Sequence, residues 1–454
     1  MTVKGQWVEV DSVQKEVYFY VDTTEDVMFL GGYVKYINSQ EVNGICKYDG
    51  ATYKRLGKGS TSCGSNACFV AFDKIKYKGE LYVESTTGEF DDTLKANGIA
   101  RWNGQKWQTV STGLKRSGGK SGLLNQMTIY KDELYVVGKF DSAGSVAAHN
   151  IAKWDGNRWY NVAPNLAVDG IRAIQFYQGE LYVAGSFRTA DEKIADIAKF
   201  NGQEWEPVAS GNMFRGSLES IFEMEVYKGE LLVAGHFKEP NSPGNFIARW
   251  NGTEWRNLGS GISDKSGGGF IEKMEVIDDK LFVAGAFDIV SDISAATIAA
   301  WDGSHWCTFD TTVALKYTSI SSFGYFRDTF YISPGVYNIN DTDFVRTYLM
   351  KWTGPLDMVE CGKDWTVGVG EVELPIHHVG DLQVFPNPAK NQITIGLKNE
   401  AVFNGEIVIK NLQGQVLFRT NEQEVTELKI DINNYSTGSY IVQYGNQSTL
   451  FIKQ

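Results

Sequence analysis

The sequence predicts an all-β protein in two parts, a seven-bladed β-propeller of four-stranded blades followed by a small C-terminal β-sandwich. The first observation is internal repetition, because two phrases recur in strict order with a period of about fifty residues, the size of a kelch-class propeller blade. The second is composition: 48 glycines and 13% aromatic residues favour short strands joined by tight turns over helices. The third is the tail after Asp381, which has strand-like alternation without the repeat.

The two phrases locate the repeating units. One is Gly-Glu-Leu-Tyr-Val-Ala-Gly-Ser-Phe at Gly179 to Phe187, and the other is Ile-Ala-Arg-Trp-Asn-Gly-Thr-Glu-Trp at Ile247 to Trp255. The first aromatic residue of the second phrase recurs at seven positions, which are Tyr48, Trp102, Trp154, Phe200, Trp250, Trp301 and Trp352. Seven copies of one unit predict seven blades, and the glycine and β-branched content argues against helical solenoids.

Each unit is expected to contain four strands, A to D. In one unit they are Ile171 to Tyr177 (A), Leu181 to Phe187 (B), Ile197 to Phe200 (C) and a strand D that begins at Trp205. Strand B is a nearly continuous apolar run, which indicates burial of both faces between neighbouring blades. Asn201-Gly202 is a two-residue hairpin signal between C and D. Because the Trp residues recur at fixed positions, we expect them to pack between blades, with sugar stacking as the alternative.

A propeller has to protect the edges of its first and last blades, because an open edge strand templates aggregation. The seventh copy lacks its strand D aromatic residue, since Asp357 stands where other copies have Trp or Tyr. At the other end, Gln6-Trp7-Val8-Glu9-Val10 has the pattern of a strand D without its blade. We therefore predict that the N-terminal strand completes the last blade. The alternative is that Leu356 to Glu360 fills this place and Trp7 packs elsewhere.

The bulk chemistry argues against several classes of function. The formal net charge of -12 argues against nucleic acid as a partner, because phosphate neutralisation needs a surplus of Lys and Arg. No stretch reaches the eighteen or so consecutive apolar residues of a membrane-spanning helix, so no membrane span is expected. No second Cys/His pair stands at zinc-ligand spacing, and we expect neither a metal nor a cofactor.

The chain has five cysteines, an odd count. Cys63 and Cys68 lie in Thr-Ser-Cys-Gly-Ser-Asn-Ala-Cys, where small residues let the backbone turn back, so a local disulfide is expected if the protein is exported. Cys46, Cys307 and Cys361 are too far apart in sequence to pair by inspection. Whether they form disulfides or remain buried thiols stays open.

The tail carries four motifs. They are Phe385-Pro386-Asn387-Pro388, a strand and turn that ends in Gly414, the Gly438-x-Tyr440 element, and the terminal Phe451-Ile452-Lys453. Together they resemble the sorting domain of type IX secretion substrates in the Bacteroidetes, with Gln454 departing from the common final Lys. The Ile-Ala-x-Trp-Asn-Gly-x-x-Trp phrase resembles the kelch-like repeats of bacterial surface propellers and of fungal cortical polarity markers.

The resemblance implies an export route. The folded C-terminal domain would engage the type IX translocon and its outer-membrane shuttle protein, and a sortase-like peptidase would then remove it. The mature protein would pass through the periplasm and outer membrane to the cell surface, or be secreted. We accordingly divide the chain into the propeller (1–360), a linker in which the cut is expected (361–380) and the sorting domain (381–454).

The longer connections of the propeller are expected to carry any ligand. Connections from B to C and from D to A are long and variable, and in an up-and-down blade they share one face of the disc, here called the loop face. Candidates for an anionic, glycan or protein ligand on this face are Lys115, Arg116, Lys120, Phe214, Arg215 and Tyr317. For each of them, a solvated loop side chain is the alternative.

The repeats and the tail together predict an exported cell-surface or secreted binding protein, active in adhesion or gliding motility, and not an enzyme. No Gly-x-Ser-x-Gly nucleophile motif is present. The first alternative is a propeller enzyme acting on glycans, because paired carboxylates can converge in the central channel without leaving a sequence motif. The second is a passive scaffold.

Overall fold

The computed structural model describes the larger part of both halves of the chain. The described residues are 7–13, 16–60, 71–85, 89–162, 166, 170–209, 213–214, 220–237, 244–259, 261–263, 269–290, 293–295, 297–309, 319–335, 347–353, 382–397, 403–411, 416–444 and 447–453. The chain forms two compact units, Met1–Gly362 and Lys363–Gln454. The predicted linker, 361–380, lies outside the described residues. Each unit is treated by itself below.

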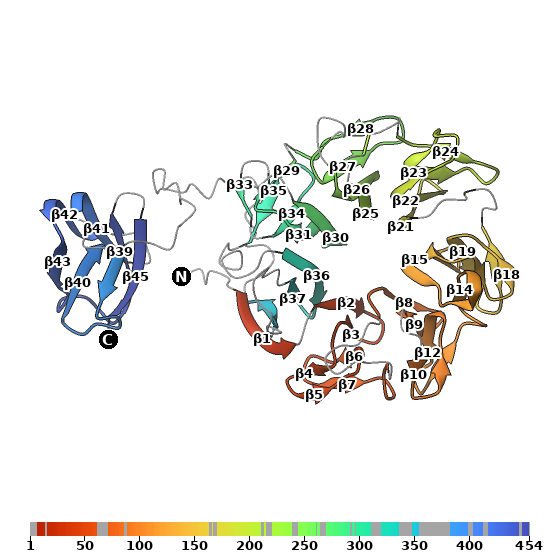
Figure 1. Ribbon diagram of the computed structural model, residues 1–454, viewed down its shortest axis with the longest axis horizontal. Coiled ribbons are helices and arrows are strands. Elements are labelled where there is room, and N and C mark those ends of the chain that lie inside the picture. The colour runs from red at the N-terminus through yellow and green to blue at the C-terminus, as the bar shows by residue number, and fades with distance from the viewer. Residues whose placement is uncertain are drawn as a thin grey trace. The chain divides into compact units, whose positions relative to one another are not determined.

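The first unit is a β-propeller, as the repeats predict (Figure 1). Seven of its described sheets contain the same four-stranded antiparallel meander, in the order A-B-C-D, and each of these is called a blade. Every A strand contacts the A strand of the next blade, and the last one, β36, contacts the first, β2. The blades therefore form a closed ring around one axis.

The A strands line the axis, and the B strands lie next to them. The A strands are β2 (Val17–Asp22), β8 (Lys74–Tyr77), β15 (Leu123–Tyr130), β21 (Ile171–Tyr177), β25 (Ser220–Tyr227), β30 (Phe270–Ile277) and β36 (Ser319–Phe326). The B strands are β3 (Val27–Gly32), β9 (Glu80–Ser85), β16 (Glu133–Lys139), β22 (Glu180–Arg188), β26 (Glu230–His236), β31 (Lys280–Ala286) and β37 (Thr329–Gly335). As their apolar sequences require, the B strands are buried on both faces.

The C and D strands complete each blade toward the outside. The C strands are β6 (Ile45–Tyr48), β12 (Gly98–Trp102), β19 (Ile151–Trp154), β23 (Ala195–Phe200), β27 (Ile247–Trp250), β34 (Ile298–Trp301) and β38 (Thr347–Trp352). The D strands are β7 (Tyr53–Arg55), β13 (Trp107–Thr109), β20 (Trp159–Asn161), β24 (Trp205–Pro207), β28 (Trp255–Arg256), β35 (Trp306–Thr308) and, from the N-terminus, β1 (Trp7–Val13). In one blade the turn from C to D is Asn201 to Glu204, between the paired residues Phe200 and Trp205, so it is longer than the predicted two residues. Gly202 has a positive φ, and Asn201 Oδ1 accepts hydrogen bonds from the amides of Gln203 and Glu204.

The longer connections add short two-residue strands. They are β4 (Tyr36–Ile37), β5 (Gln40–Glu41), β10 (Glu89–Phe90), β11 (Leu94–Lys95), β14 (Leu114–Lys115), β17 (Ser142–Ala143), β18 (Val146–Ala147), β29 (Ile262–Ser263), β32 (Ile289–Val290) and β33 (Ile293–Ser294). A single 3-10 turn, Ser117–Gly119, is the one helical element in the part of the chain that the structure describes.

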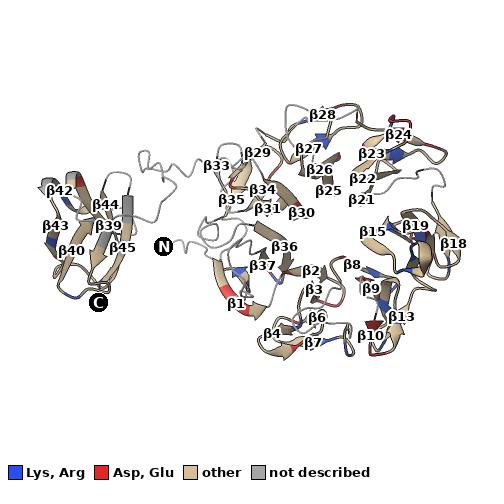
Figure 2. Ribbon diagram, viewed as in Figure 1, with Lys and Arg blue, Asp and Glu red and all other residues tan. Residues whose placement is uncertain are grey.

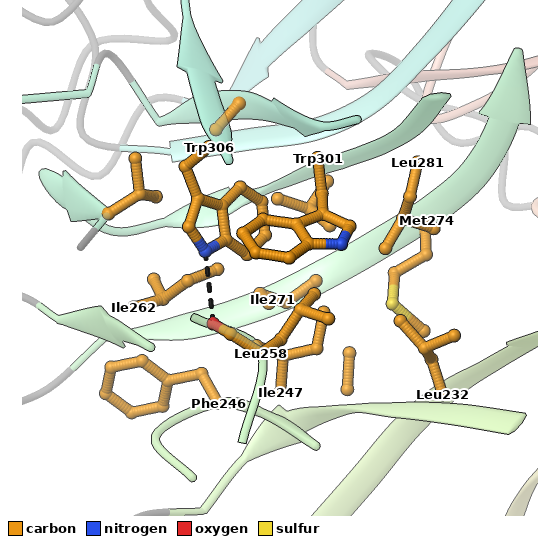
Figure 3. Close-up of a cluster of buried hydrophobic side chains, with 14 of the residues drawn as sticks. Leu232, Phe246, Ile247, Leu258, Ile262, Ile271, Met274, Leu281, Trp301 and Trp306 are labelled. Atoms are coloured by element: carbon orange, nitrogen blue, oxygen red, sulfur yellow. Dashed lines mark hydrogen bonds between the residues drawn. The ribbon is translucent and has the colours of Figure 1, made fainter. Parts of the chain in front are cut away.

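The recurring Trp residues pack between blades, as predicted. Within a blade the C-strand and D-strand rings lie together, with 5.4 Å between the ring centroids of Trp301 and Trp306. The Trp306 indole then donates a hydrogen bond to the Leu258 carbonyl of the preceding blade at 3.2 Å (Figure 3). Trp107, Trp159 and Trp255 make the same bond to the blade before them. Each of these four Trp residues thus joins two blades.

On the face of the ring opposite the loop face, the turns from A to B connect neighbouring blades. Lys78 Nζ donates to the Asp155 carbonyl at 2.8 Å, and Lys228 Nζ donates to the Asp302 carbonyl at 2.6 Å. In each case an A-to-B turn reaches the C-to-D hairpin of the following blade. These short turns therefore help to hold neighbouring blades together.

The N-terminal strand completes the last blade, which confirms the predicted closure. β1 pairs antiparallel with β38, and Trp7 lies opposite Trp352. The Trp7 ring packs at 5.3 Å from Trp352 and 5.4 Å from Phe309 of the preceding blade. Leu356 to Glu360, the alternative for this position, lie outside the described residues.

The second unit is a β-sandwich. One sheet contains β39 (Leu382–Phe385), β40 (Gln392–Leu397) and β43 (Glu427–Asp431), and the other contains β42 (Val416–Val425), β41 (Phe403–Asn411), β44 (Gly438–Tyr444) and β45 (Gln447–Lys453). Ile393 and Ile395 of the first sheet share a core with Ile407, Val442 and Phe451 of the second. This unit therefore has a hydrophobic core of its own.

We expect Gly185→Ala in strand B to destabilise the propeller. A Cβ atom at Gly185 would lie 2.0 Å from the Gly170 carbonyl oxygen, so backbone would have to move. The expected loss is about 2 kcal/mol of unfolding free energy, typical of overpacking, measured by chemical denaturation. The adjacent exposed Ser186→Ala is the control, and an equal effect of the two substitutions would contradict this interpretation of the glycine.

We expect Trp7→Ala to weaken ring closure. Trp7 is 8% exposed and packs on two blades, so its truncation leaves a cavity at the closing seam. The expected cost is about 3 kcal/mol, seen as a lower midpoint of thermal unfolding of the full chain. Glu9→Ala on the same strand is the control. A midpoint that Trp7→Ala leaves unchanged would contradict closure by β1.

Candidate functional site

A polar cavity of about 430 Å³ lies along the axis of the propeller. It is lined by the A strands β2, β15, β21, β25, β30 and β36 and by Phe72 to Lys74 at the start of β8, so that all seven blades contribute. We call it the central channel. Its volume lies within the range of ligand-binding pockets, roughly 300–1,000 Å³.

A β-bulge recurs at the same level of five A strands. In β15, pairing with β16 shifts by one residue between Leu124 and Gln126. The extra residues in the five strands are Asn125, Arg172, Phe222, Glu272 and Ser321. Bulges re-aim side chains and are frequent beside functional sites. All five bulge residues line the central channel.

Phe72 has the corresponding place in the second blade. The Glu84 amide donates to the Asp73 carbonyl at 3.0 Å, and the Ala71 amide donates to the Glu84 carbonyl at 3.0 Å. Phe72 is left between these two bonds and faces the channel. The pairing of β2 with β3 shows no such shift. We call Phe72 and the five bulge residues the bulge ring.

The bulge ring varies in chemistry although its neighbours repeat. The residue before each bulge is Leu or Ile and is buried, at Leu124, Ile171, Ile221, Ile271 and Ile320. The second residue after it is also apolar and buried, at Met127, Ile174, Met224, Met274 and Phe323. Between these fixed positions stand an amide, a guanidinium, a phenyl ring, a carboxylate and a hydroxyl. Packing holds the apolar positions constant, whereas the bulge position varies in chemistry and faces the channel.

The bulge ring lies toward the loop face, because each bulge closely follows the start of an A strand, where the D-to-A connection enters. Its members contact the next blade. Asn125 Nδ2 donates to the Ile171 carbonyl at 2.6 Å. The Arg172 guanidinium lies 5.0 Å from the centroid of the Phe222 ring. The ring is therefore a connected set of side chains at one mouth of the channel.

Deeper in the channel, side chains bind backbone amides of the next blade. Asp73 Oδ2 accepts a hydrogen bond from the Met127 amide at 2.5 Å, and Gln126 Oε1 accepts one from the Ile174 amide at 2.7 Å. These bonds join neighbouring A strands at the axis. They hold the channel wall in one geometry before any ligand arrives.

Among the residues that line the central channel, carboxylates outnumber cations. Over the described blades as a whole, acidic and basic residues are interspersed (Figure 2). Burial raises the pKa of Glu223 to about 8, and the Lys273 charge offsets this only in part. Burial likewise raises the pKa of Glu225 and of Glu272 to about 7. Near neutral pH the wall therefore presents protonated carboxyl groups, which both donate and accept hydrogen bonds.

Lys273 is a partly buried cation of this wall, which also includes the buried Lys74. Burial lowers the pKa of Lys273, but the Glu275 carboxylate, 2.9 Å from its Nζ, more than offsets that effect and the pKa lies above its usual value. Within the described part of the chain, no group of three or more His, Cys, Asp or Glu side chains is arranged to hold a metal ion.

Three of the sequence-predicted loop candidates lie together, away from the channel. Lys115 ends β14, the Arg116 amide donates to the Lys120 carbonyl at 2.8 Å, and Arg116 Nε donates to the Ser121 carbonyl at 2.8 Å. Lys120 is exposed. These residues form a small basic turn in one D-to-A connection, and none of them lines the central channel.

The expectation for Phe214 is corrected by its burial. Phe214 is 1% exposed, and its ring packs at 5.0 Å from Phe237 and 4.9 Å from Trp255. A loop aromatic residue next to an apolar blade face gains more from burial than from solvent exposure, so Phe214 belongs to the core. Arg215 and Tyr317 lie outside the described residues.

The cysteines divide into three groups. Cys46 is a free, fully buried thiol, and burial raises its pKa far above the usual value. Cys307 is disulfide-bonded. Cys63, Cys68 and Cys361 lie outside the described residues, so the predicted local disulfide stays a prediction.

In the second unit, the Pro-Asn-Pro segment is attached to the last strand. The Asn387 side chain accepts a hydrogen bond from the Ile452 amide at 2.9 Å, and the Ala389 amide donates to the Ile452 carbonyl at 2.7 Å. Asn387 thus completes the edge pairing of β45 where a neighbouring strand would otherwise do so. Pro386 and Pro388, on either side of Asn387, are exposed.

The remaining predicted residues of this unit have mixed environments. Tyr440 and Phe451 are core residues, and the Tyr440 hydroxyl donates to the Ser436 carbonyl at 2.5 Å. Phe385 and Ile452 are instead 44% and 41% exposed. Gly438 begins β44 and Lys453 ends β45, whereas Gly414 lies outside the described residues. The motifs therefore include both core residues, Tyr440 and Phe451, and solvent-exposed apolar side chains, Phe385 and Ile452.

Comparison with known families assigns this unit. Residues 383–454 match the family described as secretion system C-terminal sorting domain. The second unit is a type IX secretion sorting domain. The sorting domain directs export through the type IX system to the cell surface or beyond. In the described part of the chain, no helix has the length and apolarity needed to cross a membrane.

The propeller matches a second family. Residues 115–331 match the Rax2 C-terminal beta propeller domain. No curated protein matches the chain in sequence. Together with the sorting domain, these matches identify a propeller protein that carries a type IX export signal.

Three solved structures are similar in fold at low identity. PorZ, described as an essential bacterial surface component of the type IX secretion system of Porphyromonas gingivalis, has 13% identity and a TM-score of 0.37, covering 97% of this chain and 66% of that one. The WD40 propeller domain of Doa1 has 10% identity and a TM-score of 0.42, covering 77% and 97%. A structural genomics protein of unknown function from Bacteroides thetaiotaomicron has 12% identity and a TM-score of 0.35, covering 75% and 90%. These resemblances are remote and carry no functional argument.

Sequence reasoning missed the bulge ring. A signal was present, because the aligned A strands read Leu-Asn-Gln-Met, Ile-Arg-Ala-Ile, Ile-Phe-Glu-Met and Ile-Glu-Lys-Met, with two chemically variable positions between repeated apolar ones, of which the first is the bulge residue. In an unbulged strand that position belongs to a fixed face of the blade. Only the observed register reveals that its side chain enters the channel.

The raised pKa of Glu223 predicts how stability depends on pH. Because the folded state holds this proton more tightly, unfolding becomes easier as pH rises from the usual carboxyl range to about 8. Glu223→Gln removes the cost of ionisation. We expect the variant to be more stable than the wild type at pH 9, by on the order of 1 kcal/mol after allowance for water in the channel, and nearly equal at pH 4.5.

Thermal unfolding of both proteins across this pH range measures the difference. Glu204→Gln, on an exposed C-to-D hairpin, controls for the loss of one negative charge. If Glu223→Gln stabilised the protein equally at pH 4.5 and pH 9, the described environment of Glu223 would be wrong.

Proposed function

We propose that this protein is an exported binding module whose propeller is displayed at the cell surface, or released from it, after the sorting domain has been used and removed. Recognition of the sorting domain by the type IX translocon and its outer-membrane shuttle, followed by cleavage by a sortase-like peptidase, is part of the proposal. The family match of residues 383–454 is the observation that carries it.

The surface of the sorting domain supports recognition by other proteins. Four large apolar side chains, Phe385, Val416, Leu417 and Ile452, are between 39% and 44% exposed, although the domain has a complete core without them. Exposed apolar side chains of this kind on a small domain are typical of interaction surfaces. Phe385 lies two residues before Asn387, and the Ile452 amide donates to Asn387, so two of these exposed side chains belong to the family motifs.

The disulfide of Cys307 supports an oxidising destination. Disulfides persist in the periplasm and at cell surfaces, whereas cytosolic thiols are kept reduced. The disulfide of Cys307 is therefore consistent with the proposed export of the propeller.

A binding role is favoured over a passive scaffold because the central channel is lined by chemically diverse side chains at an otherwise repeated position. Adhesion and gliding motility are the processes that such a surface module would serve. Glycan cleavage is the second candidate, since Glu223, Glu225 and Glu272 bring carboxyl groups with raised pKa values into one cavity, as glycosidases do. A scaffold would need neither feature.

Asn387→Ala tests the export proposal. Loss of the acceptor for the Ile452 amide weakens the attachment of the Pro-Asn-Pro segment to β45, although the bond from the Ala389 amide to the Ile452 carbonyl remains. In a host with a type IX system, we expect the full chain to reach the cell surface or medium and to lose the mass of the sorting domain. The variant should instead be retained, uncut, with surface display reduced at least tenfold by immunoblot of cell fractions.

Asn434→Ala, an exposed residue of the same domain, is the matched control and should be exported normally. Deletion of residues 382–454 should abolish export completely. Surface display of that deletion at the wild-type level would overturn the proposed function.

A further inference from the structure

We propose that the bulge ring binds the sugar ring of an uncharged carbohydrate at the loop-face mouth of the central channel. The inference deepens the proposed binding function and rests on it. It is carried by the side chains that the repeated bulge brings to one level, and by the cavity of about 430 Å³ beneath them.

Two aromatic rings supply stacking surfaces. Phe72 and Phe222 are both half-buried and line the channel, three blades apart in a closed series of seven. Each is held by other rings, with Tyr18 at 5.1 Å from Phe72 and Phe270 at 6.3 Å from Phe222. The Arg172 guanidinium lies over one face of Phe222, and a phenyl face held in place by such neighbours suits the apolar C–H face of a pyranose.

The blades between the two rings supply hydrogen-bonding groups. Going around the mouth, Asn125 and Arg172 follow Phe72, and Glu272 and Ser321 follow Phe222. Asn125 and Arg172 are exposed, so their remaining donors are open to a ligand. Hydroxyl groups on the rim of a sugar need such donors and acceptors beside an aromatic face.

The charge of the wall favours an uncharged ligand. An anion that contacts Arg172 would also approach Glu272 and Glu223, which ionise as pH rises. A cation would compete with cations already placed, because Arg172 lies over Phe222 and Lys273 is paired with Glu275. A neutral polyol is neither repelled by the carboxylates nor in competition with Arg172 and Lys273. Protonated carboxyl groups can also donate hydrogen bonds to its hydroxyls.

Deeper residues limit the length of the ligand. Below the bulge ring the wall includes Gln126, Thr128 and Gln175, all polar and only partly buried. A cavity of about 430 Å³ is small for a pocket, whose range begins at roughly 300 Å³. The channel is therefore suited to one or two sugar residues, such as the end of a longer chain.

The test uses the full chain and a printed array of neutral oligosaccharides of glucose, galactose, mannose and xylose. Acidic oligosaccharides and spermidine serve as charged probes. The tightest neutral binder is then titrated by calorimetry. We expect Phe222→Ala and Phe72→Ala each to weaken its binding at least tenfold, and Asn125→Ala to weaken it several-fold.

Phe176→Ala is the matched control, because Phe176 lies near the opposite end of its A strand, packed at 3.7 Å on Tyr130. It should bind as the wild type does. Thermal unfolding of each variant shows that the ring is intact, and surface display of Phe222→Ala reports export independently of binding.

No binding of neutral sugars up to millimolar concentration, tighter binding of the acidic probes or spermidine, or equal affinity of Phe222→Ala and the wild type would each overturn the inference. Normal surface display combined with any of these results leaves the proposed export function standing. Mass spectrometry of the incubated oligosaccharides distinguishes binding from cleavage, and products at a catalytic rate would assign the site to an enzyme.

Discussion

Packing of one blade face against the next is the constraint on which the rest of the structure depends. A four-stranded sheet whose B strand is buried on both faces cannot be stable alone, because its apolar faces need cover from two neighbours. A row of such sheets always leaves two faces uncovered unless it closes. Pairing of β1 with β38 completes the last blade, and contact between β36 and β2 closes the ring. At four boundaries a D-strand Trp then adds one hydrogen bond to the preceding blade, as Trp306 does with Leu258.

Closure also explains why a binding site can form at the axis. Each A strand contacts the A strands of two neighbouring blades and pairs with strand B of its own blade. Its other edge pairs with no strand in the described sheets and faces the channel. The bulge uses this edge, since one extra residue per strand faces the channel while the apolar residue before it stays buried. The bulge in strand A requires a glycine on strand B, at Gly138, Gly185, Gly235 and Gly285. A Cβ atom at any of these positions would lie 2.0 to 2.2 Å from a carbonyl oxygen at or just before the start of strand A. The glycine of the repeated phrase and the variable residue of the channel are therefore two consequences of one backbone feature.

Periodic features were predictable from the sequence, and convergent ones were not. The repeated phrases gave the propeller, the packing of Trp306 and the closing role of Trp7, because each depends on residues at a constant offset within a unit. The tail motifs predicted the sorting domain through their resemblance to a known family, which the match of residues 383–454 confirms. Phe214 was misjudged because a loop position says little about burial when an apolar face lies beside it. The bulge ring joins residues about fifty positions apart through a register shift, and no local pattern shows such a shift.

The position of β1 also bears on how the two units can be separated. β38 pairs with β37 on one side and with β1 on the other, so both of its edges are already used inside the propeller. The last strand of the ring therefore comes from the N-terminus, and the chain beyond Trp352 is not needed to cover it. The sorting domain, in turn, buries Ile393, Ile407 and Phe451 in a core of its own. If the last blade had been completed by the segment that leads to the tail, a cut near that segment would have put ring closure at risk. Because closure is supplied from the N-terminal end, the proposed removal of the sorting domain would leave the pairing of β1 with β38 intact.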